Sequence, residues 1–151
     1  MKAELLKSKV NIAHGIEEIK QFLLNPEAEQ IELPLKHSFS PGIYARELEI
    51  PEGTLLIGKI HKHRHHNFLM KGEIIVITES GGMELLQAPL TIVSEPGTQI
   101  VGYALTDTLW TTIHTNKNNT EDLKVLEEIN VVDEMSKYIE YKNNLTKKIT
   151  I

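Results

Sequence analysis

Hydrophobic residues near the N-terminus recur with a helical period. Between Asn11 and Asn25 they stand three or four positions apart, the spacing that lines one face of a helix. Asn25-Pro26 is expected to stop this helix, because proline disfavours helical backbone in the residue before it. The apolar positions are Ile12, Ile16, Ile19 and Leu23.

From Ile31 to Thr115 the pattern changes to short β-like segments separated by turn residues such as Ser40-Pro41-Gly42. The spacing leaves no room for crossover helices, so we expect mainly antiparallel pairing. Gly81-Gly82 predicts a hairpin that leads into a further strand beginning at Met83. The other expected strands are Ile43–Ile50, Thr54–His61, Ile74–Thr78, Leu90–Ser94, Ile100–Leu105 and Thr108–His114.

After the polar loop 116–119 the chain is expected to return to helix. Thr120, followed by two acidic residues, predicts an N-cap and a helix through Ile129. The apolar residues from Met135 to Ile139 indicate another helical turn or two. The tail 143–151 is interpreted as an edge strand or a disordered end.

Length and composition predict one domain over residues 1–151, with a helical segment 1–30, a β-barrel 31–115 and a C-terminal segment 116–151. The net charge of −5 and the scattered Lys and Arg residues argue against nucleic-acid binding. No stretch is apolar enough for a membrane span or a signal peptide, so we expect the protein to stay where it is synthesised. The absence of cysteine excludes disulfides and thiolate ligands.

Four of the seven histidines fall within the six residues 61–66. On an extended strand His61, His63 and His65 would share one face, and neutral imidazole is the commonest protein ligand for transition metals. Residues i and i+4 of a straight strand lie about 13 Å apart, so one ion would reach all three only if the chain bends near His65. A solvated hairpin end is the alternative interpretation.

His114 ends a different β-like segment and is the remaining histidine of the β region that could approach this run. A polar residue at a strand end is the simpler interpretation of it. His14 and His37 are interpreted as surface or structural residues. Tyr44 and Arg46 share a strand face and are candidate pocket residues, with surface pairing of Arg46 as the alternative.

Trp110, the chain's one tryptophan, has the same strand parity as His114 and is a third candidate for the pocket, with core packing as the alternative.

Two blocks resemble the cupin motifs. His61-Lys62-His63-Arg64-His65-His66-Asn67, followed by Gly72, is similar to the first motif, with Asn67 at the position of its glutamate. Glu95-Pro96-Gly97-Thr98-Gln99-Ile100 is similar to the second, with Ile100 at the position of its histidine. The resemblance implies an all-β cupin-like double-stranded β-helix, or jelly roll, with a short N-terminal helix and one or two C-terminal helices. It implies a reduced metal site on His61 and His63, which His65, Asn67 or His114 would complete.

The chain also resembles small cupin-like proteins of tailed bacteriophages over about residues 31–126. The matching blocks are Pro41 to Glu47, Pro51 to Thr54, Gly58 to His63, Pro96 to Thr98 and Asp107 to His114. This resemblance implies a viral gene product of the host cytoplasm or the virion, and a homodimer. It supplies no settled activity.

Two functions are compatible with these observations. In the first, the barrel holds a divalent transition metal, Zn, Fe, Mn or Ni, beside a pocket for a small-molecule ligand; the residues do not decide whether the site is catalytic. In the second, the barrel is a non-catalytic virion-associated or accessory module for binding or oligomerisation, with the histidines vestigial or structural.

Overall fold

The computed structural model describes residues 21, 25, 27, 31–77 and 82–149. The helix predicted for residues 11–25, and His14 with it, lie largely outside these described residues. No helix among them is long and apolar enough to cross a membrane.

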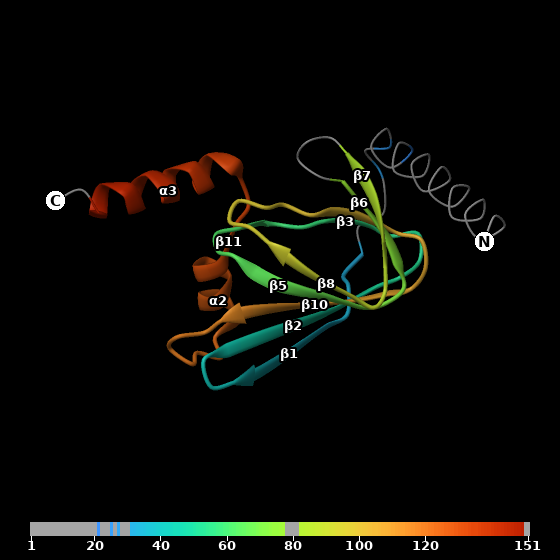
Figure 1. The fold of residues 1–151 in the computed structure, drawn as a ribbon, viewed down its shortest axis with the longest axis horizontal. Helices are drawn as coiled ribbons and strands as arrows, with labels where there is room; N and C mark the ends of the chain where they lie inside the picture. The colour runs from blue at the N-terminus through green and yellow to red at the C-terminus, as the bar shows by residue number, and fades with distance from the viewer. Residues whose placement is uncertain (1–20, 22–24, 26, 28–30, 78–81, 150–151) are drawn as a thin grey trace.

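Antiparallel strands make up most of the regular secondary structure of the described chain (Figure 1). The largest sheet has five strands in the order β1 (Leu35–Ser40), β2 (Ile43–Ile50), β10 (Thr108–Thr115), β5 (His65–Lys71) and β8 (Leu90–Ser94). A second sheet has four, in the order β3 (Leu55–Ile57), β9 (Val101–Ala104), β6 (Glu73–Ile77) and β7 (Met83–Gln87). Two short strands, β4 (Ile60–His61) and β11 (Val131–Val132), pair with each other. The predicted all-β antiparallel architecture is confirmed.

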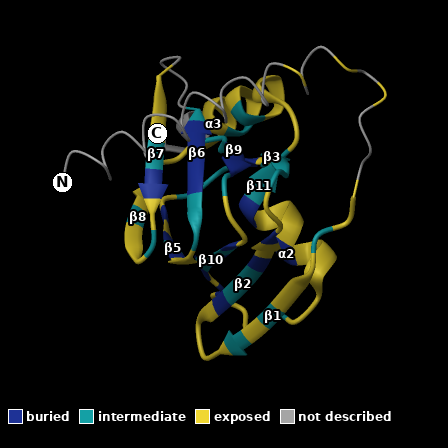
Figure 2. Cartoon of the chain, turned by 90° about the vertical axis from the view of Figure 1, so that its right-hand side faces the viewer, coloured by how far each residue is buried: buried dark blue, intermediate teal, exposed yellow. Residues whose placement is uncertain are grey.

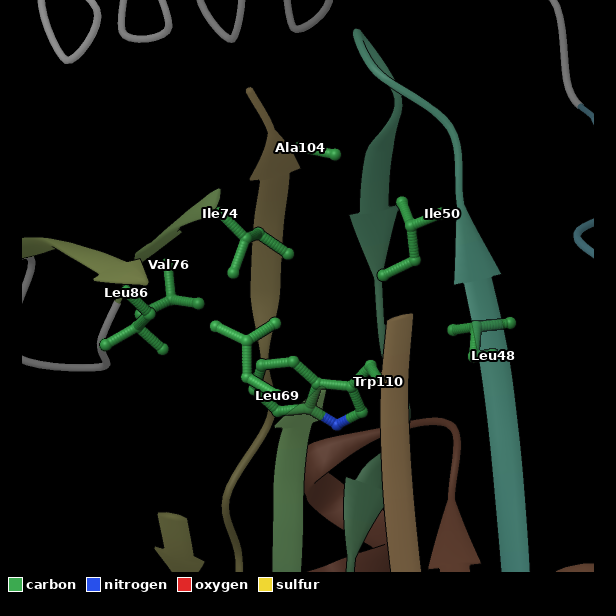
Figure 3. Close-up of a cluster of buried hydrophobic side chains, with 8 residues drawn as sticks. All are labelled: Leu48, Ile50, Leu69, Ile74, Val76, Leu86, Ala104 and Trp110. Atoms are coloured by element: carbon green, nitrogen blue, oxygen red, sulfur yellow. The ribbon is translucent and has the colours of Figure 1, made fainter. Parts of the chain in front are cut away.

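The core lies between the two larger sheets, and side chains from both fill it (Figure 3). Strand β10 shows how the sequence produces this arrangement, because its buried residues, from Thr108 to His114, alternate with less buried ones. Trp110 of that strand packs with core residues of the facing sheet. The buried cluster consists of Leu48, Ile50, Leu69, Ile74, Val76, Leu86, Ala104 and Trp110.

The predicted strand Thr54–His61 is wrong in one respect, because the structure divides it into β3 and β4. The chain passes from one sheet to another at Gly58, whose backbone N–H donates to the carbonyl oxygen of Ile100 at 2.8 Å. A side chain at Gly58 would crowd that carbonyl, since a Cβ built there would lie 3.0 Å from its oxygen. This crossing places His61 next to strands of the five-stranded sheet.

The C-terminal segment differs from expectation at two points. Asp122, not Thr120, is the N-cap of α2 (Leu123–Asn130), and its carboxylate accepts from the backbone N–H groups of Lys124 and Val125. The tail is neither an edge strand nor disordered as far as residue 149, because α3 (Met135–Ile149) continues to that point. Most of its described side chains are exposed (Figure 2).

Candidate metal centre

The histidine run is bent and does not form one strand. Strand β4 ends at His61, β5 begins at His65, and the residues between them form a bend. The rings of His61 and His65 therefore stack, with centroids 4.1 Å apart and planes 28° apart. The expectation that His61, His63 and His65 share one face of a single strand is wrong, because the run spans the junction of two sheets.

His114 joins these two rings from β10. Its ring centroid lies 5.4 Å from that of His61 and 5.3 Å from that of His65. The register explains the approach, since β10 pairs with β5 through Ile113 and His66, which places the next inward residue of each strand side by side. We call His61, His65 and His114 the histidine cluster.

The structure leaves His63 outside the cluster. Its Nε2–H donates to the carbonyl oxygen of Ile129 at 3.0 Å, and its ring meets Tyr141 edge-on. The adjacent Lys62 donates from Nζ to the carbonyl of Glu128 at 2.5 Å and from its backbone N–H to Asn130. These contacts satisfy carbonyl groups at the C-terminal end of α2, whose last turn has no basic residue of its own.

Asn67 is 1% exposed, and its amide has hydrogen-bond partners on two other strands. Its Oδ1 accepts from Trp110 Nε1 at 3.2 Å and from Thr112 Oγ1 at 2.9 Å. Its Nδ2 donates to Ser94 Oγ at 2.8 Å. The side chain thus connects β5 with β10 and β8, and both ends of its amide are engaged in this structure.

Burial keeps the cluster uncharged. It lowers the pKa of His61 to about 3, with further lowering from the charges of His65, His114 and Arg46. It lowers the pKa of His114 to about 4, helped by His65, Arg46 and His63. Burial also lowers the pKa of His65. At neutral pH these rings are neutral imidazoles, the form that binds metal ions.

The donor atoms of the cluster fit a transition metal in type, although the rings are not arranged as in a loaded site. Nδ1 of His61 and Nε2 of His65 are buried without a hydrogen-bond partner, and such atoms call for an explanation. The rings of His61 and His65 stack, and no group of three or more His, Cys, Asp or Glu side chains in the described chain is arranged to hold an ion.

A cavity of about 530 Å³ opens beside the cluster, within the size range of small-molecule sites. His61 and His114 line it, and so do the three residues predicted for the pocket, Tyr44, Arg46 and Trp110. The apolar part of the wall includes Leu33, Leu35, Leu48, Leu56, Ile57, Ile74, Ile100, Leu123, Leu126 and Val131.

His37, predicted to be a surface or structural residue, also lines the cavity. Its Nδ1 lies 2.7 Å from the hydroxyl oxygen of Tyr44, and the two rings stack. The pairing of β1 with β2 sets His37 opposite Arg46 and points it inward. The Ser40-Pro41-Gly42 turn is the sequence signal that could have indicated this pairing, because a hairpin closed there sets residue 37 opposite residue 46.

No protein-family model and no curated protein matches the sequence. Similar solved structures share the fold at low identity. Ectoine synthase from P. lautus matches with a TM-score of 0.54 and 10% identity, over 69% of this chain and 77% of that one. An uncharacterised double-stranded β-helix protein from Klebsiella pneumoniae matches with a TM-score of 0.51 and 12% identity, over 62% and 85%.

A putative ethanolamine utilization protein Q from Salmonella typhimurium matches with a TM-score of 0.50 and 15% identity, over 60% of this chain and 75% of that one. Identities this low show a common fold and no more. Together with the antiparallel sheets and the enclosed core, they establish that this chain has the cupin-like double-stranded β-helix fold.

Proposed function

We propose that this cupin-fold protein binds a divalent transition metal through His61, His65 and His114, and a small molecule in the adjacent cavity. The observation that carries the proposal is the pair of buried ring nitrogens without partners, Nδ1 of His61 and Nε2 of His65. A metal ion would satisfy both atoms. His63 is left out because its ring lies against Ile129 and Tyr141, outside the cluster, and Asn67 because both ends of its amide are engaged.

The donor set narrows the choice of ion. Of the four ions expected, neutral imidazoles without carboxylates suit Zn, Fe and Ni better than Mn, which prefers oxygen ligands. Three protein ligands would leave positions open toward the cavity, as in catalytic metal sites, and a bound ion there would supply a Lewis acid or a centre for dioxygen. The chain's own contribution is to keep the three rings uncharged and their neighbourhood largely apolar.

Elemental analysis of protein purified without a histidine tag tests the proposal. We expect a stoichiometric transition metal, either as purified or after incubation with Zn²⁺, Fe²⁺, Mn²⁺ or Ni²⁺. The metal should be lost in the double variant His61→Ala, His114→Ala. His66→Ala is the matched control, because His66 belongs to the same run but is exposed and pairs with Val93. Folded protein that binds none of the four ions would overturn the proposal.

The stacked orientation of the rings favours a second candidate, a non-catalytic binding or oligomerisation module whose histidines are structural. In that case the histidines contribute to the stability of the fold through the packing of their rings. Folded, metal-free protein with unchanged stability after addition of the four ions is its expected outcome. The same elemental analysis therefore separates the two functions.

We propose in addition that the protein comes from a tailed bacteriophage, acts in the host cytoplasm or the virion, and forms a homodimer. The phage origin is supported by the ordered sequence blocks described above. The dimer is supported by the edge strands β1 and β8 of the larger sheet, which each have one side free for pairing within the described chain. Mass spectrometry of infected host cells and of purified virions tests the location, and absence of the protein from both is the opposing result. Sedimentation of the protein tests the dimer, and a monomer is the opposing result.

A further inference from the structure

Arg46 brings an uncompensated positive charge to the cavity. It lies half-buried on β2, between His37 of β1 and Thr112 of β10 in register. Among the described residues it has no ion-pair partner. Glu127 is the carboxylate among the described lining residues, and it is already paired with Lys59. Lys59 and Glu127 pair with each other, so Arg46 is the cation of the described lining that has no carboxylate partner.

Beyond His37 and Thr112, which flank Arg46 in register, much of the cavity wall is apolar. The next inward residue along β2 is Leu48, which stands opposite Trp110, and further leucines and isoleucines complete the wall. A cation partly removed from water is stabilised by a counter-ion that binds with it in the same cavity. The planar guanidinium matches the two oxygens of a carboxylate, and the apolar wall matches a hydrocarbon body.

We propose that the cavity binds a small organic monocarboxylate, with its carboxylate on the guanidinium of Arg46 and its apolar body against Leu48 and Trp110. The proposal specifies the ligand class of the cavity named under the proposed function. One guanidinium beside an apolar wall matches a carboxylate on a hydrocarbon body better than a phosphate without one. The carboxylate contact does not require the metal, so the two proposals can fail separately.

The fluorescence of Trp110 can report ligand binding, because Trp110 is the one tryptophan of the chain and lies in the cavity wall. Its fluorescence is followed while metal-free protein in EDTA is titrated with sodium octanoate and, separately, with 1-octanol. We expect saturable binding of octanoate at least about tenfold tighter than that of octanol, since hydrogen bonds between charged groups contribute this much. Equal affinities, or no octanoate binding, would overturn the proposal.

The chain contains two arginines, which provide a matched pair of variants. Arg46→Gln should weaken octanoate binding about tenfold or more and leave octanol binding unchanged. Arg64→Gln should leave both unchanged, because the Arg64 side chain is 66% exposed and paired with Glu95 at 3.1 Å. An Arg46→Gln protein that folds and binds octanoate as well as the wild type contradicts the proposal. If that variant does not fold, the comparison of octanoate with octanol in the wild type decides.

Inorganic phosphate tests the alternative that Arg46 binds a phosphate group in place of a carboxylate. We expect phosphate to displace octanoate only at concentrations well above those at which octanoate binds. If phosphate displaced octanoate at lower concentrations, the cavity would be a phosphate site and the proposal would be overturned. Metal uptake, measured on a separate sample without EDTA, reports on the histidine cluster, so a protein that binds octanoate but takes up none of the four ions would reject the metal site alone.

Discussion

The Nδ1–H of His65 donates to the carbonyl oxygen of His63 at 2.9 Å. Because a carbonyl oxygen only accepts, this bond places the ring proton on Nδ1 and leaves a lone pair on Nε2, the atom that is buried without a partner. A hydrogen bond on the second nitrogen is what orients most metal-binding histidines. The backbone carbonyl of His63 thus orients the ring of His65, whereas the side chain of His63 hydrogen-bonds to the C-terminal end of α2.

The variant His63→Ala separates these two contributions. It keeps the backbone carbonyl that orients His65 and removes only the ring that binds the carbonyl of Ile129. We expect unchanged metal content and a loss of about 1 kcal/mol in the free energy of unfolding, the usual contribution of one hydrogen bond. Elemental analysis and denaturant titration measure the two quantities. Loss of metal in this variant, with the fold intact, would place His63 among the ligands.

Replacing Asn67 by alanine should destabilise the barrel strongly. The change leaves the indole N–H of Trp110 and the hydroxyl of Thr112 without their buried acceptor. We expect a loss of about 3 kcal/mol in denaturant unfolding, since buried unsatisfied groups cost about 1–3 kcal/mol each. Asn143→Ala on the exposed face of α3 is the control and should change stability by less than about 0.5 kcal/mol. Similar losses in both variants would show that the amide of Asn67 has no special role.

Strands specified by local signals could be predicted from the sequence, and their bounds were accurate. Ile43–Ile50 and Leu90–Ser94 are found as expected, because alternation and flanking turns define them without reference to distant residues. The division of residues 54–61 could not be predicted. It depends on the pairing of β4 with β11, some seventy positions later in the chain.

The candidate site shows the same division between local and long-range information. The parity of Tyr44 with Arg46, and of Trp110 with His114, followed from strand alternation, and all four residues line the cavity. The stacking of His61 on His65 did not follow, because it needs a bend where two sheets meet. Local periodicity treats a strand as straight and places those residues about 13 Å apart.

Two glycines with similar backbone angles should respond differently to alanine. Gly42 has φ +76° and open space around its Cα, whereas a Cβ on Gly72, with φ +89°, would collide with the carbonyl oxygen of Asp107. Gly42→Ala should cost about 1–2 kcal/mol for left-handed backbone alone. Gly72→Ala should cost clearly more, because the β5–β6 turn must also move away from Asp107. Denaturant unfolding compares them, and equal losses would mean that the turn relaxes freely.

The stability of the metal-free protein should fall as the pH drops below about 6.5. The pKa of His61 is lowered to about 3 and that of His114 to about 4 in the folded chain, whereas both return to about 6.5 on unfolding. Between these values the unfolded chain binds more protons than the folded one, so the free energy of unfolding rises with pH. Each histidine contributes a slope of up to about 1.4 kcal/mol per pH unit, which disappears above about pH 7.

Denaturant titrations in EDTA at pH 4 to 7.5 measure this slope. Protonation of carboxylates contributes equally to related variants, so the comparison between variants isolates the histidines. The double variant His61→Gln, His114→Gln should show a clearly shallower loss of stability between pH 6.5 and pH 4. His66→Gln, which changes an exposed ring outside the cluster, should keep the wild-type slope. If the double variant lost stability as steeply as the wild type, the burial of neutral imidazoles would not be what makes this barrel sensitive to acid.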